Sequence, residues 1–332
     1  MTRKFGRGLI VGKFSPLHRG HEAIIATALE SCDEVCLVSY ANPELPGCDV
    51  ARREQWVSEL FPKVRHLALG PREVPPDDED ATTHRRFCGS LCLRKLGGPV
   101  DAVFTGEDYG DAFAAELTRY FREHGTYAGS VVHVRVDRAA AAISGTLLRR
   151  DIHGRRDWLS PAVYASFVRR VCLLGGESTG KSTLAKTLAR EFNTVHAAEY
   201  GRELWELKGG MLDFDDLERI GRTQVEREES AARTAFRFLF CDSSPLTTLF
   251  YSRHLFGRAT RDLERLAERP YDVTILCAPD FPFVQDGTRQ PEAFRTHQHE
   301  WYVEELTRRR IPYVLVDGTL ADRIERVGSI LA

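Results

Sequence analysis

Residues Gly175-Gly-Glu-Ser-Thr-Gly-Lys-Ser-Thr183 have the spacing of a phosphate-binding P-loop and directly follow the apolar run Val171–Leu174. A strand, a glycine-rich loop and a helix in this order wrap backbone N–H groups around a bound phosphate. We therefore expect Lys181 to reach the β- and γ-phosphates of ATP and Ser182 to ligate Mg²⁺. The residues expected to contact this nucleotide are Gly176, Glu177, Ser178, Thr179, Gly180, Lys181, Ser182 and Thr183.

A second phosphate-binding pattern, Gly12-Lys-Phe-Ser-Pro-Leu-His-Arg-Gly-His21, follows an apolar run near the start of the chain. It contains the HxGH signature of nucleotidyltransferases. Histidines three residues apart lie on one face of a helix, and a helix N-terminus adds unpaired N–H groups that favour phosphate. An acceptor phosphate is expected to attack the α-phosphorus of ATP, with charge stabilised by His18, His21, Lys13 and Mg²⁺. Further nucleotide contacts are expected from Gly12, Phe14 and Gly20.

The segment Ile143-Ser-Gly-Thr-Leu-Leu-Arg149 is similar to the ISxTxxR motif of the same nucleotidyltransferase class. Ser144 is expected to cap a helix, Thr146 to donate a hydrogen bond from its first turn, and Arg149 to face the same way one turn later. A guanidinium group suits the phosphates that leave as pyrophosphate. An ordinary capped helix without a catalytic role is the alternative for this segment taken alone.

Two carboxylates end strand-like runs in the second half of the chain. Glu199 is expected to hold the ribose hydroxyl that becomes phosphorylated, and Asp242 to hold Mg²⁺ as a Walker B aspartate would. A charge at a helix start is the alternative for Glu199, and a helix N-cap is the alternative for Asp242. Arg289 is either the tip of a lid that reaches the transferred phosphate or an exposed arginine on a surface loop.

Strand-length apolar runs alternate with helical patterns along both halves of the chain, which predicts α/β domains with parallel sheets and ligands at the carboxyl ends of the strands. We expect a Rossmann-like nucleotidyltransferase domain at residues 1–155 and a P-loop kinase domain at residues 156–332. The boundary is expected between Asp151 and Arg170, where Gly154, Trp158 and Pro161 interrupt the pattern.

Composition narrows the classes of function. The chain has 332 residues, a hydrophobic fraction of 42% and a net charge of −2, so bulk charge favours neither nucleic acid nor an anionic membrane as a partner. No apolar stretch approaches the ~20 residues of a bilayer span, and no apolar signal segment follows Met1. The 8 cysteines form no CxxC pair, which favours buried, reduced thiols in a cytoplasmic protein. A homo-oligomer stays an open alternative.

With these motifs in order, the chain resembles the NadR-type bifunctional nicotinamide mononucleotide (NMN) adenylyltransferases and ribosylnicotinamide kinases. The resemblance extends over nearly the whole length. The matching segments are GKFSPLHRGH (12–21), REQW (53–56), ISGTLLR (143–149), Trp158, GGESTGKSTL (175–184), EYGRE (199–203), FCDSSPLTT (240–248) and PDFPFVQDGTR (279–289).

The resemblance implies an enzyme of NAD salvage with ATP as co-substrate in both domains. The C-terminal domain would phosphorylate ribosylnicotinamide to NMN, and the N-terminal domain would adenylylate NMN to NAD⁺ with release of pyrophosphate. Substrate contacts would come from Arg53, Trp56, Tyr200 and Phe283, with Phe281 as a further aromatic candidate. An aromatic face suits a pyridinium cation, although Trp56 could equally be a packing residue.

The chain departs from the family pattern at several positions. Asp242-Ser-Ser244 lacks the second acid that relatives often carry after this strand, Phe283 replaces a lid tryptophan, and Ala139–Ala142 replace a proline-bearing step. The first strand begins within ten residues of Met1, so a repressor domain is not expected. Two alternative functions remain: a fused enzyme of the coenzyme A synthase type, and a nucleotide-sensing regulator with little turnover.

Overall fold

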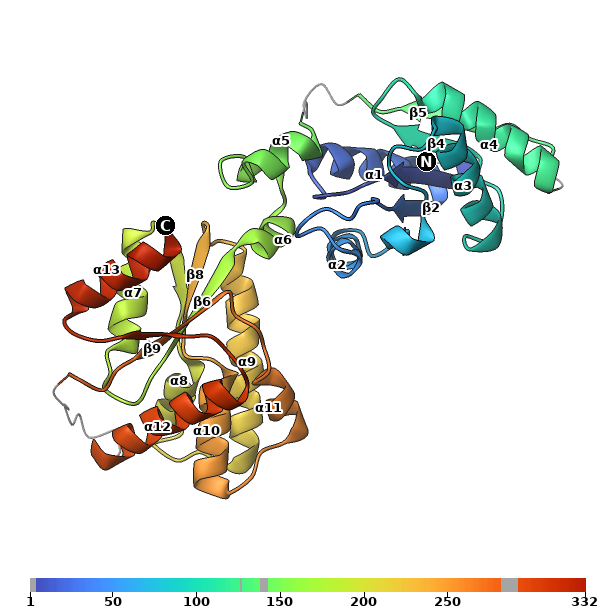
Figure 1. Ribbon diagram of the computed structural model, residues 1–332. Coiled ribbons are helices and arrows are strands. Elements are labelled where there is room, and N and C mark those ends of the chain that lie inside the picture. The colour runs from blue at the N-terminus through green and yellow to red at the C-terminus, as the bar shows by residue number, and fades with distance from the viewer. Residues whose placement is uncertain (1–3, 126, 138–142, 282–291) are drawn as a thin grey trace. The chain divides into compact units, whose positions relative to one another are not determined.

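The chain forms two compact units, Met1–Phe167 and Val168–Ala332. The computed structural model describes residues 4–125, 127–137, 143–281 and 292–332. Each unit is built around one five-stranded sheet, and neighbouring strands pair in parallel (Figure 1). The α/β class with two parallel sheets, predicted from the alternation of strand and helix patterns, is confirmed.

In the first unit the strand order is β3-β2-β1-β4-β5, so the chain moves outward from β1 to β3 and then returns across the sheet to β4. The strands are β1 (Phe5–Gly12), β2 (Cys32–Ser39), β3 (Arg65–Ala68), β4 (Ala102–Thr105) and β5 (Val132–Arg135). The helices are α1 (Arg19–Ser31), α2 (Val50–Leu60), α3 (Ala81–Arg94), α4 (Gly110–His124), α5 (Gly145–Arg150) and α6 (Pro161–Tyr164), with short 3₁₀ turns η1 (Pro71–Glu73), η3 (Arg156–Trp158) and η4 (Ala165–Phe167).

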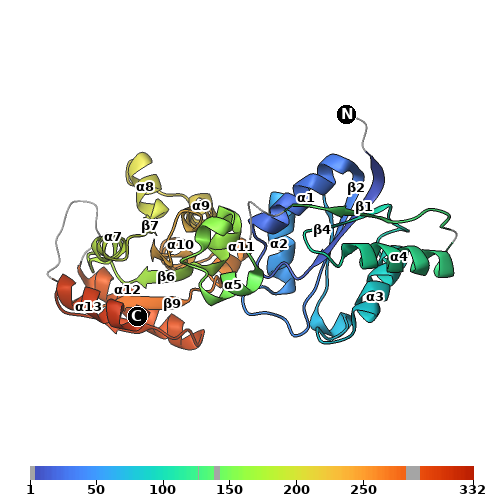
Figure 2. The same cartoon turned by 90° about the horizontal axis from the view of Figure 1, so that it is seen from above.

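The reversal of strand order determines where helices lie in this unit. Right-handed crossovers place α1 on one face of the sheet, and the return after β3 places α3 and α4 on the other (Figure 2). Leu9 of β1 packs in the same buried cluster as Leu91 of α3 and Leu117 of α4. The carboxyl ends of β1 and β4 lie side by side at the reversal, which is where open α/β sheets bind ligands.

In the second unit the strand order is β10-β9-β6-β8-β7. The strands are β6 (Arg169–Leu174), β7 (Val195–Ala197), β8 (Phe238–Asp242), β9 (Val273–Cys277) and β10 (Val314–Val316). The helices are α7 (Lys181–Glu191), α8 (Tyr200–Leu207), α9 (Phe214–Ala232), α10 (Pro245–Phe256), α11 (Arg261–Leu266), α12 (Glu292–Arg308) and α13 (Leu320–Leu331).

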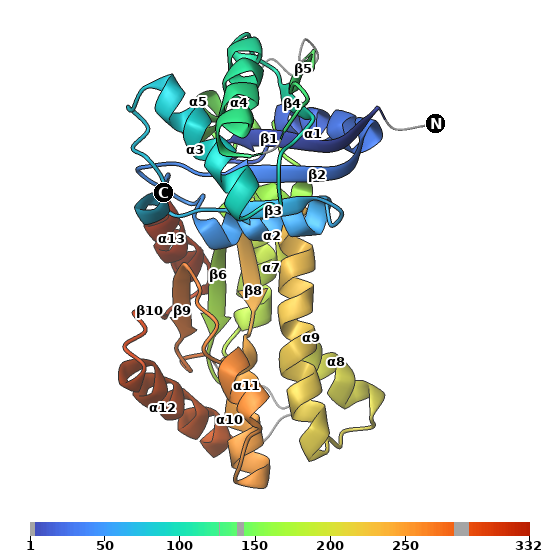
Figure 3. The same ribbon diagram turned by 90° about the vertical axis from the view of Figure 1, so that its right-hand side faces the viewer.

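Both faces of the central strand β6 are buried, because successive side chains of a strand point to opposite faces. Val171 and Leu173 pack with α7 and α13, whereas Cys172 and Leu174 pack with α8 to α12. Figure 3 shows α9 beside β8, with α10 and α11 packed near its first turns. The P-loop follows β6 directly, so the middle of the sheet positions the phosphate-binding loop.

The boundary between the units lies within the predicted segment 151–170, but later than the predicted division at 155/156. Residues 161–167 remain with the first unit because α2 holds them: Arg52 donates to the Ser166 carbonyl at 2.8 Å, and Trp56 Nε1 donates to Ser166 Oγ at 2.9 Å. All eight cysteines are buried thiols outside any disulfide. No helix among the described residues is long and apolar enough to cross a membrane.

Candidate active sites

The HxGH segment forms the loop between β1 and α1. His18 is the N-cap residue of α1, and the rings of His18 and His21 stack with their centroids 3.7 Å apart, so the two histidines share one face as predicted. Phe14 has a left-handed backbone (φ 49°) and lies buried, with its ring 4.5 Å from that of His21. Gly20 is buried in the first turn of α1. The buried Phe14 ring thus supports the loop by packing against the His21 ring.

The predicted helix of the ISxTxxR segment is α5, and it lies against this loop. Ser144 caps α5 by accepting from the Leu147 N–H at 3.3 Å. Arg149 donates to the Ser15 carbonyl and, at 3.1 Å, to Thr146 Oγ1. A Cβ on Gly145 would lie 3.0 Å from the Ser15 carbonyl oxygen, so the small residue permits this close approach. The two motifs, far apart in sequence, therefore meet at one place.

A cavity of about 680 Å³ opens where these elements converge. Gly12, Lys13, Phe14, His21, Thr146 and Arg149 line it, and so do residues that follow β4. This is the volume expected for a nucleotide-sized ligand. Lys13 is ion-paired with Asp77 at 2.6 Å, at an exposed position of the wall. Most of the residues that the sequence assigned to adenylyl transfer thus surround one cavity.

Two predicted substrate contacts, Arg53 and Trp56, do not line this cavity. The Arg53 side chain is fully buried, and its guanidinium donates to Ser39 Oγ at 3.2 Å and to the Leu69 carbonyl at 2.9 Å. Trp56 is 1% exposed and donates its indole N–H to Ser166. The structure gives both residues a packing role in α2, which is the alternative that the sequence left open for Trp56.

In the second unit the backbone of the P-loop adopts positive φ angles at two glycines, a conformation that glycine allows. Gly175 and Gly180 have positive φ angles of 145° and 80°, and Ser178 also has one, of 60°. Lys181 Nζ and Thr179 Oγ1 both donate to the Gly176 carbonyl, at 2.9 and 2.8 Å, and close the loop on itself. Ser182 and Thr183 lie in the first turn of α7, which begins at Lys181. The loop has the strand–loop–helix context that the motif requires.

Glu199 is the N-cap residue of α8, yet its side chain makes no capping hydrogen bond. Burial raises the pKa of its carboxyl above the ordinary value of 4.5; the carboxylates of Asp242 and Glu177 add to this rise, and the Lys181 ammonium opposes it. Lys181, Asp242 and Glu177 are therefore close enough to Glu199 for their charges to act on its carboxyl. Glu199 thus lies beside the P-loop and is not engaged in capping its helix.

Asp242 ends β8 and pairs in register with Leu173, the penultimate residue of β6. It is 3% exposed, and its Oδ1 atom has no hydrogen-bond partner within the described parts of the chain. The cap of α10 is Ser244, whose Oγ accepts from the Leu246 N–H at 3.3 Å. The N-cap alternative for Asp242 is therefore not what the structure contains, because Ser244 holds that position.

These observations fit the magnesium site expected from the sequence. Mg²⁺ in phosphate-transfer sites takes one or two protein oxygens and completes its shell with phosphate oxygens and water. The buried Asp242 oxygen and the Ser182 hydroxyl are a donor set of this kind. Over the described ranges, no group of three or more His, Cys, Asp and Glu side chains could hold a metal by protein ligands alone.

The remaining predicted residues differ in their placement. Tyr200 is 7% exposed and packs in the core, with the Arg227 guanidinium 4.5 Å from its ring centroid, so its ring is not open to a substrate. Phe281 lies beside Gly180, and the Arg323 guanidinium carbon is 4.1 Å from its ring centroid. Phe283 and Arg289 lie outside the described residues, and so does the Ala139–Ala142 step.

Sequence patterns missed several side chains that hold the P-loop. Glu177 is held from two sides: its N–H donates to Gln298 Oε1 at 3.0 Å, and its carboxylate accepts from Tyr251 Oη at 2.8 Å. Arg323 is 1% exposed and donates to the Thr179 carbonyl at 2.8 Å. The residues come from α10, α12 and α13. No local motif marks them, because only the fold brings these helices to the loop.

Comparison with known proteins adds independent observations. A family model described as "AAA domain" matches residues 170–323. Two curated bacterial proteins are similar to the chain, and each is named "Trifunctional NAD biosynthesis/regulator protein NadR". The protein of Escherichia coli (strain K12) is 27% identical over 334 residues, which is 93% of this chain and 78% of the relative. That of Salmonella typhimurium (strain LT2) is 28% identical over 301 residues, covering 85% and 71%. The chain is thus similar to these two NadR proteins over most of its length.

Solved structures agree with this relationship in fold. A crystal structure of NadR protein in complex with NR has a TM-score of 0.70 and 22% identity, and the alignment covers 98% of this chain and 96% of that one. A second, of NadR protein in complex with NAD and AMP-PNP, has a TM-score of 0.67 and 21% identity, with coverage of 98% and 95%. The two-unit architecture is therefore the one found in those NadR structures.

Proposed function

We propose that the chain is a bifunctional transferase of NAD salvage. Its second unit transfers the γ-phosphate of ATP to the 5′-hydroxyl of ribosylnicotinamide and gives NMN. Its first unit joins NMN to the AMP part of another ATP and gives NAD⁺ and pyrophosphate. One observation carries the proposal: each unit has a loop with the sequence of a phosphate-binding motif directly after a central strand of its sheet.

In the second unit, the groups around the P-loop have distinct proposed roles. Glu199 accepts a hydrogen bond from the ribose and orients the 5′-hydroxyl, since its carboxylate is beside the loop and is not used as a cap. Lys181 moves from the Gly176 carbonyl to the β- and γ-phosphates when ATP binds. Ser182 and Asp242 would hold Mg²⁺, which supplies charge neutralisation at the transferred phosphoryl group.

In the first unit, the chemistry needs no protein nucleophile, because the NMN phosphate itself attacks the α-phosphorus. His18 and His21 donate hydrogen bonds to the triphosphate from the N-terminus of α1, and Arg149 neutralises the pyrophosphate that leaves. Gly12, Phe14 and Thr146 line the cavity against the nucleotide, and Ser144 caps the helix that carries Thr146. The role of the protein is positioning and electrostatic stabilisation.

The assignment is tested by two variants with separable effects. Lys181→Ala should reduce phosphorylation of ribosylnicotinamide by at least about 100-fold and leave NAD⁺ formation from supplied NMN unchanged. His21→Ala should do the reverse. Both reactions are followed by chromatography of the nucleotides, with dephospho-coenzyme A as an alternative acceptor. Equal loss of both activities in either variant, or phosphorylation of dephospho-coenzyme A instead, would refute the proposal.

A further inference from the structure

Among the residues that the structure describes, three side chains with a permanent positive charge line the cavity of the first unit: Lys13, Arg85 and Arg149. Two of them already have protein partners. Lys13 is ion-paired with Asp77, and Arg149 donates to Ser15 and Thr146. Arg85 is different, because it has neither a hydrogen bond nor an ion pair with any residue that the structure describes. Its guanidinium is therefore available to a ligand of the cavity.

The residues next to Arg85 on α3 both have hydrogen-bond partners in the protein, so the lack of a partner is specific to Arg85. His84 also lines the cavity, but Tyr40 Oη contacts its Nδ1 at 2.9 Å and the Pro76 carbonyl contacts its Nε2 at 3.0 Å. Arg86 turns away toward α4, where it donates to Glu116 at 3.0 Å and lies over the Tyr120 ring. Arg85 alone of these three consecutive residues faces the cavity without a protein partner.

The residues that line the cavity come from two groups of elements. Lys13 and Arg149 belong to the β1–α1 loop and to α5, the two elements that carry the triphosphate-binding motifs. Arg85 belongs to α3, together with the other cavity residues His84 and Cys88, and Tyr40 follows β2. An adenylyl acceptor brings a phosphate dianion toward an anionic triphosphate, so the site needs positive charge on the acceptor's side as well. A planar guanidinium can bind two phosphate oxygens at once.

We propose that Arg85 binds the phosphate of the acceptor mononucleotide during adenylyl transfer. This inference rests on the proposed function of the first unit and adds to it the residue that holds the attacking phosphate. In this reaction Lys13, His21 and Arg149 act on the triphosphate, and Arg85, on α3, holds the phosphate that attacks.

The test uses the full-length chain with Arg85→Gln, Arg85→Lys and the matched control Arg72→Gln. Arg72 is an exposed arginine of η1 that does not line the cavity. Dinucleotide formation is measured with NMN and with its carboxylate analogue, nicotinic acid mononucleotide, at varied ATP. Phosphorylation of ribosylnicotinamide by the same preparation reports whether the chain is folded.

Arg85→Gln should raise KM for both mononucleotides about tenfold or more, because it removes a charge-assisted contact that both acceptors share. KM for ATP and the kinase rate should stay at the wild-type values. Arg85→Lys should recover part of the loss, and Arg72→Gln should show none.

Unchanged KM values for both mononucleotides would overturn the inference. A rise confined to the carboxylate analogue would also overturn it, since Arg85 would then bind the pyridine substituent. A wild-type chain that makes no dinucleotide would refute the proposed function itself.

Discussion

At the scale of single residues, the carboxyl of Glu199 gives the kinase reaction a predicted dependence on pH. Burial raises the pKa of Glu199 above 4.5, and the neighbouring Asp242 and Glu177 carboxylates act in the same direction. An acceptor of the ribose hydrogen bond must be ionised. The kinase kcat/KM should therefore fall as the pH drops through this raised pKa, and it should be constant above it.

The measurement is a pH profile of kcat/KM for ribosylnicotinamide at saturating ATP. The acid limb should have its midpoint above 4.5, and Glu199→Gln should lower kcat/KM by about 100-fold and remove that limb. Glu206→Gln, which changes an exposed carboxylate on the same helix, is the matched control and should behave as wild type. A midpoint at or below 4.5 would contradict the raised pKa of Glu199, and an acid limb that persists in Glu199→Gln would show that another group titrates.

Single residues also show what a sequence can and cannot predict about the candidate sites. Positions fixed by local chain geometry were predictable: the stacked histidines, the cap at Ser144 and the left-handed glycines of the P-loop are where the motifs place them. The role of Arg53 was not predictable, because nothing in its local sequence pattern shows that α2 buries its guanidinium completely. Arg85 was missed for the opposite reason, since only the assembled cavity distinguishes it from its neighbour Arg86.

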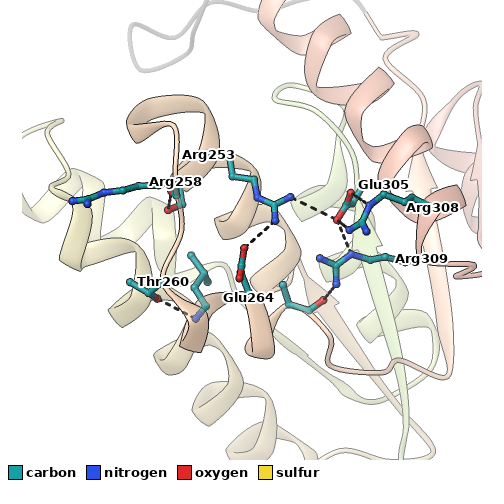
Figure 4. Close-up of polar contacts among 10 residues, drawn as sticks. Arg253, Arg258, Thr260, Glu264, Glu305, Arg308 and Arg309 are labelled. Atoms are coloured by element: carbon teal, nitrogen blue, oxygen red, sulfur yellow. Dashed lines mark hydrogen bonds and ion pairs between the residues drawn. The ribbon is translucent and has the colours of Figure 1, made fainter.

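At the scale of elements, an ion-pair cluster joins α10, α11 and α12 (Figure 4). Glu305 is 6% exposed and accepts from Arg308 Nη2 at 2.6 Å and Arg309 Nε at 2.7 Å. Arg253 donates to Glu264 at 3.1 Å and lies 4.0 Å from Glu305. Hydrogen bonds from Arg308, reinforced by those from Arg309, lower the pKa of Glu305 from 4.5 to about 2.

A lowered carboxyl pKa stabilises the fold above the unfolded-state value and loses its effect as the pH falls toward the folded-state value. Glu305→Gln should therefore reduce the free energy of unfolding at neutral pH, by roughly 1–3 kcal/mol. The difference from wild type should shrink between pH 4.5 and about 2. Urea unfolding at several pH values measures it, with the exposed neighbour Glu304→Gln as control. A difference that does not change with pH would mean that the charge of Glu305 is not responsible.

Most elements that position the sites were predictable from their patterns, and the exceptions have physical causes. The helical spacing of apolar residues over 51–60 and 111–124 predicts two helices, which correspond to α2 and α4 with boundaries within one residue. The edge strand β3 was missed because its four residues are only partly buried and show no clear alternation. The compact units divide after Phe167, and no local pattern assigns residues 161–167 to the first unit, because their contacts with α2 are tertiary.

At the scale of the whole molecule, two units of similar size each combine a parallel sheet with one phosphate-binding loop. The strand orders differ, and so do the groups beside each loop: stacked histidines and arginines in the first unit, a lysine and carboxylates in the second. Groups of this kind suit attack at different phosphorus atoms of ATP, the α-phosphorus in one unit and the γ-phosphorus in the other.

We propose that one chain consumes ATP in two chemically different ways on the path to one product. The most direct measurement is the balance of nucleotide products after incubation of the purified chain with ribosylnicotinamide, ATP and Mg²⁺. Once NMN has reached a steady level, the account predicts one ADP and one pyrophosphate for each NAD⁺ that forms. Release of ADP without pyrophosphate or NAD⁺, or of neither product, would contradict it.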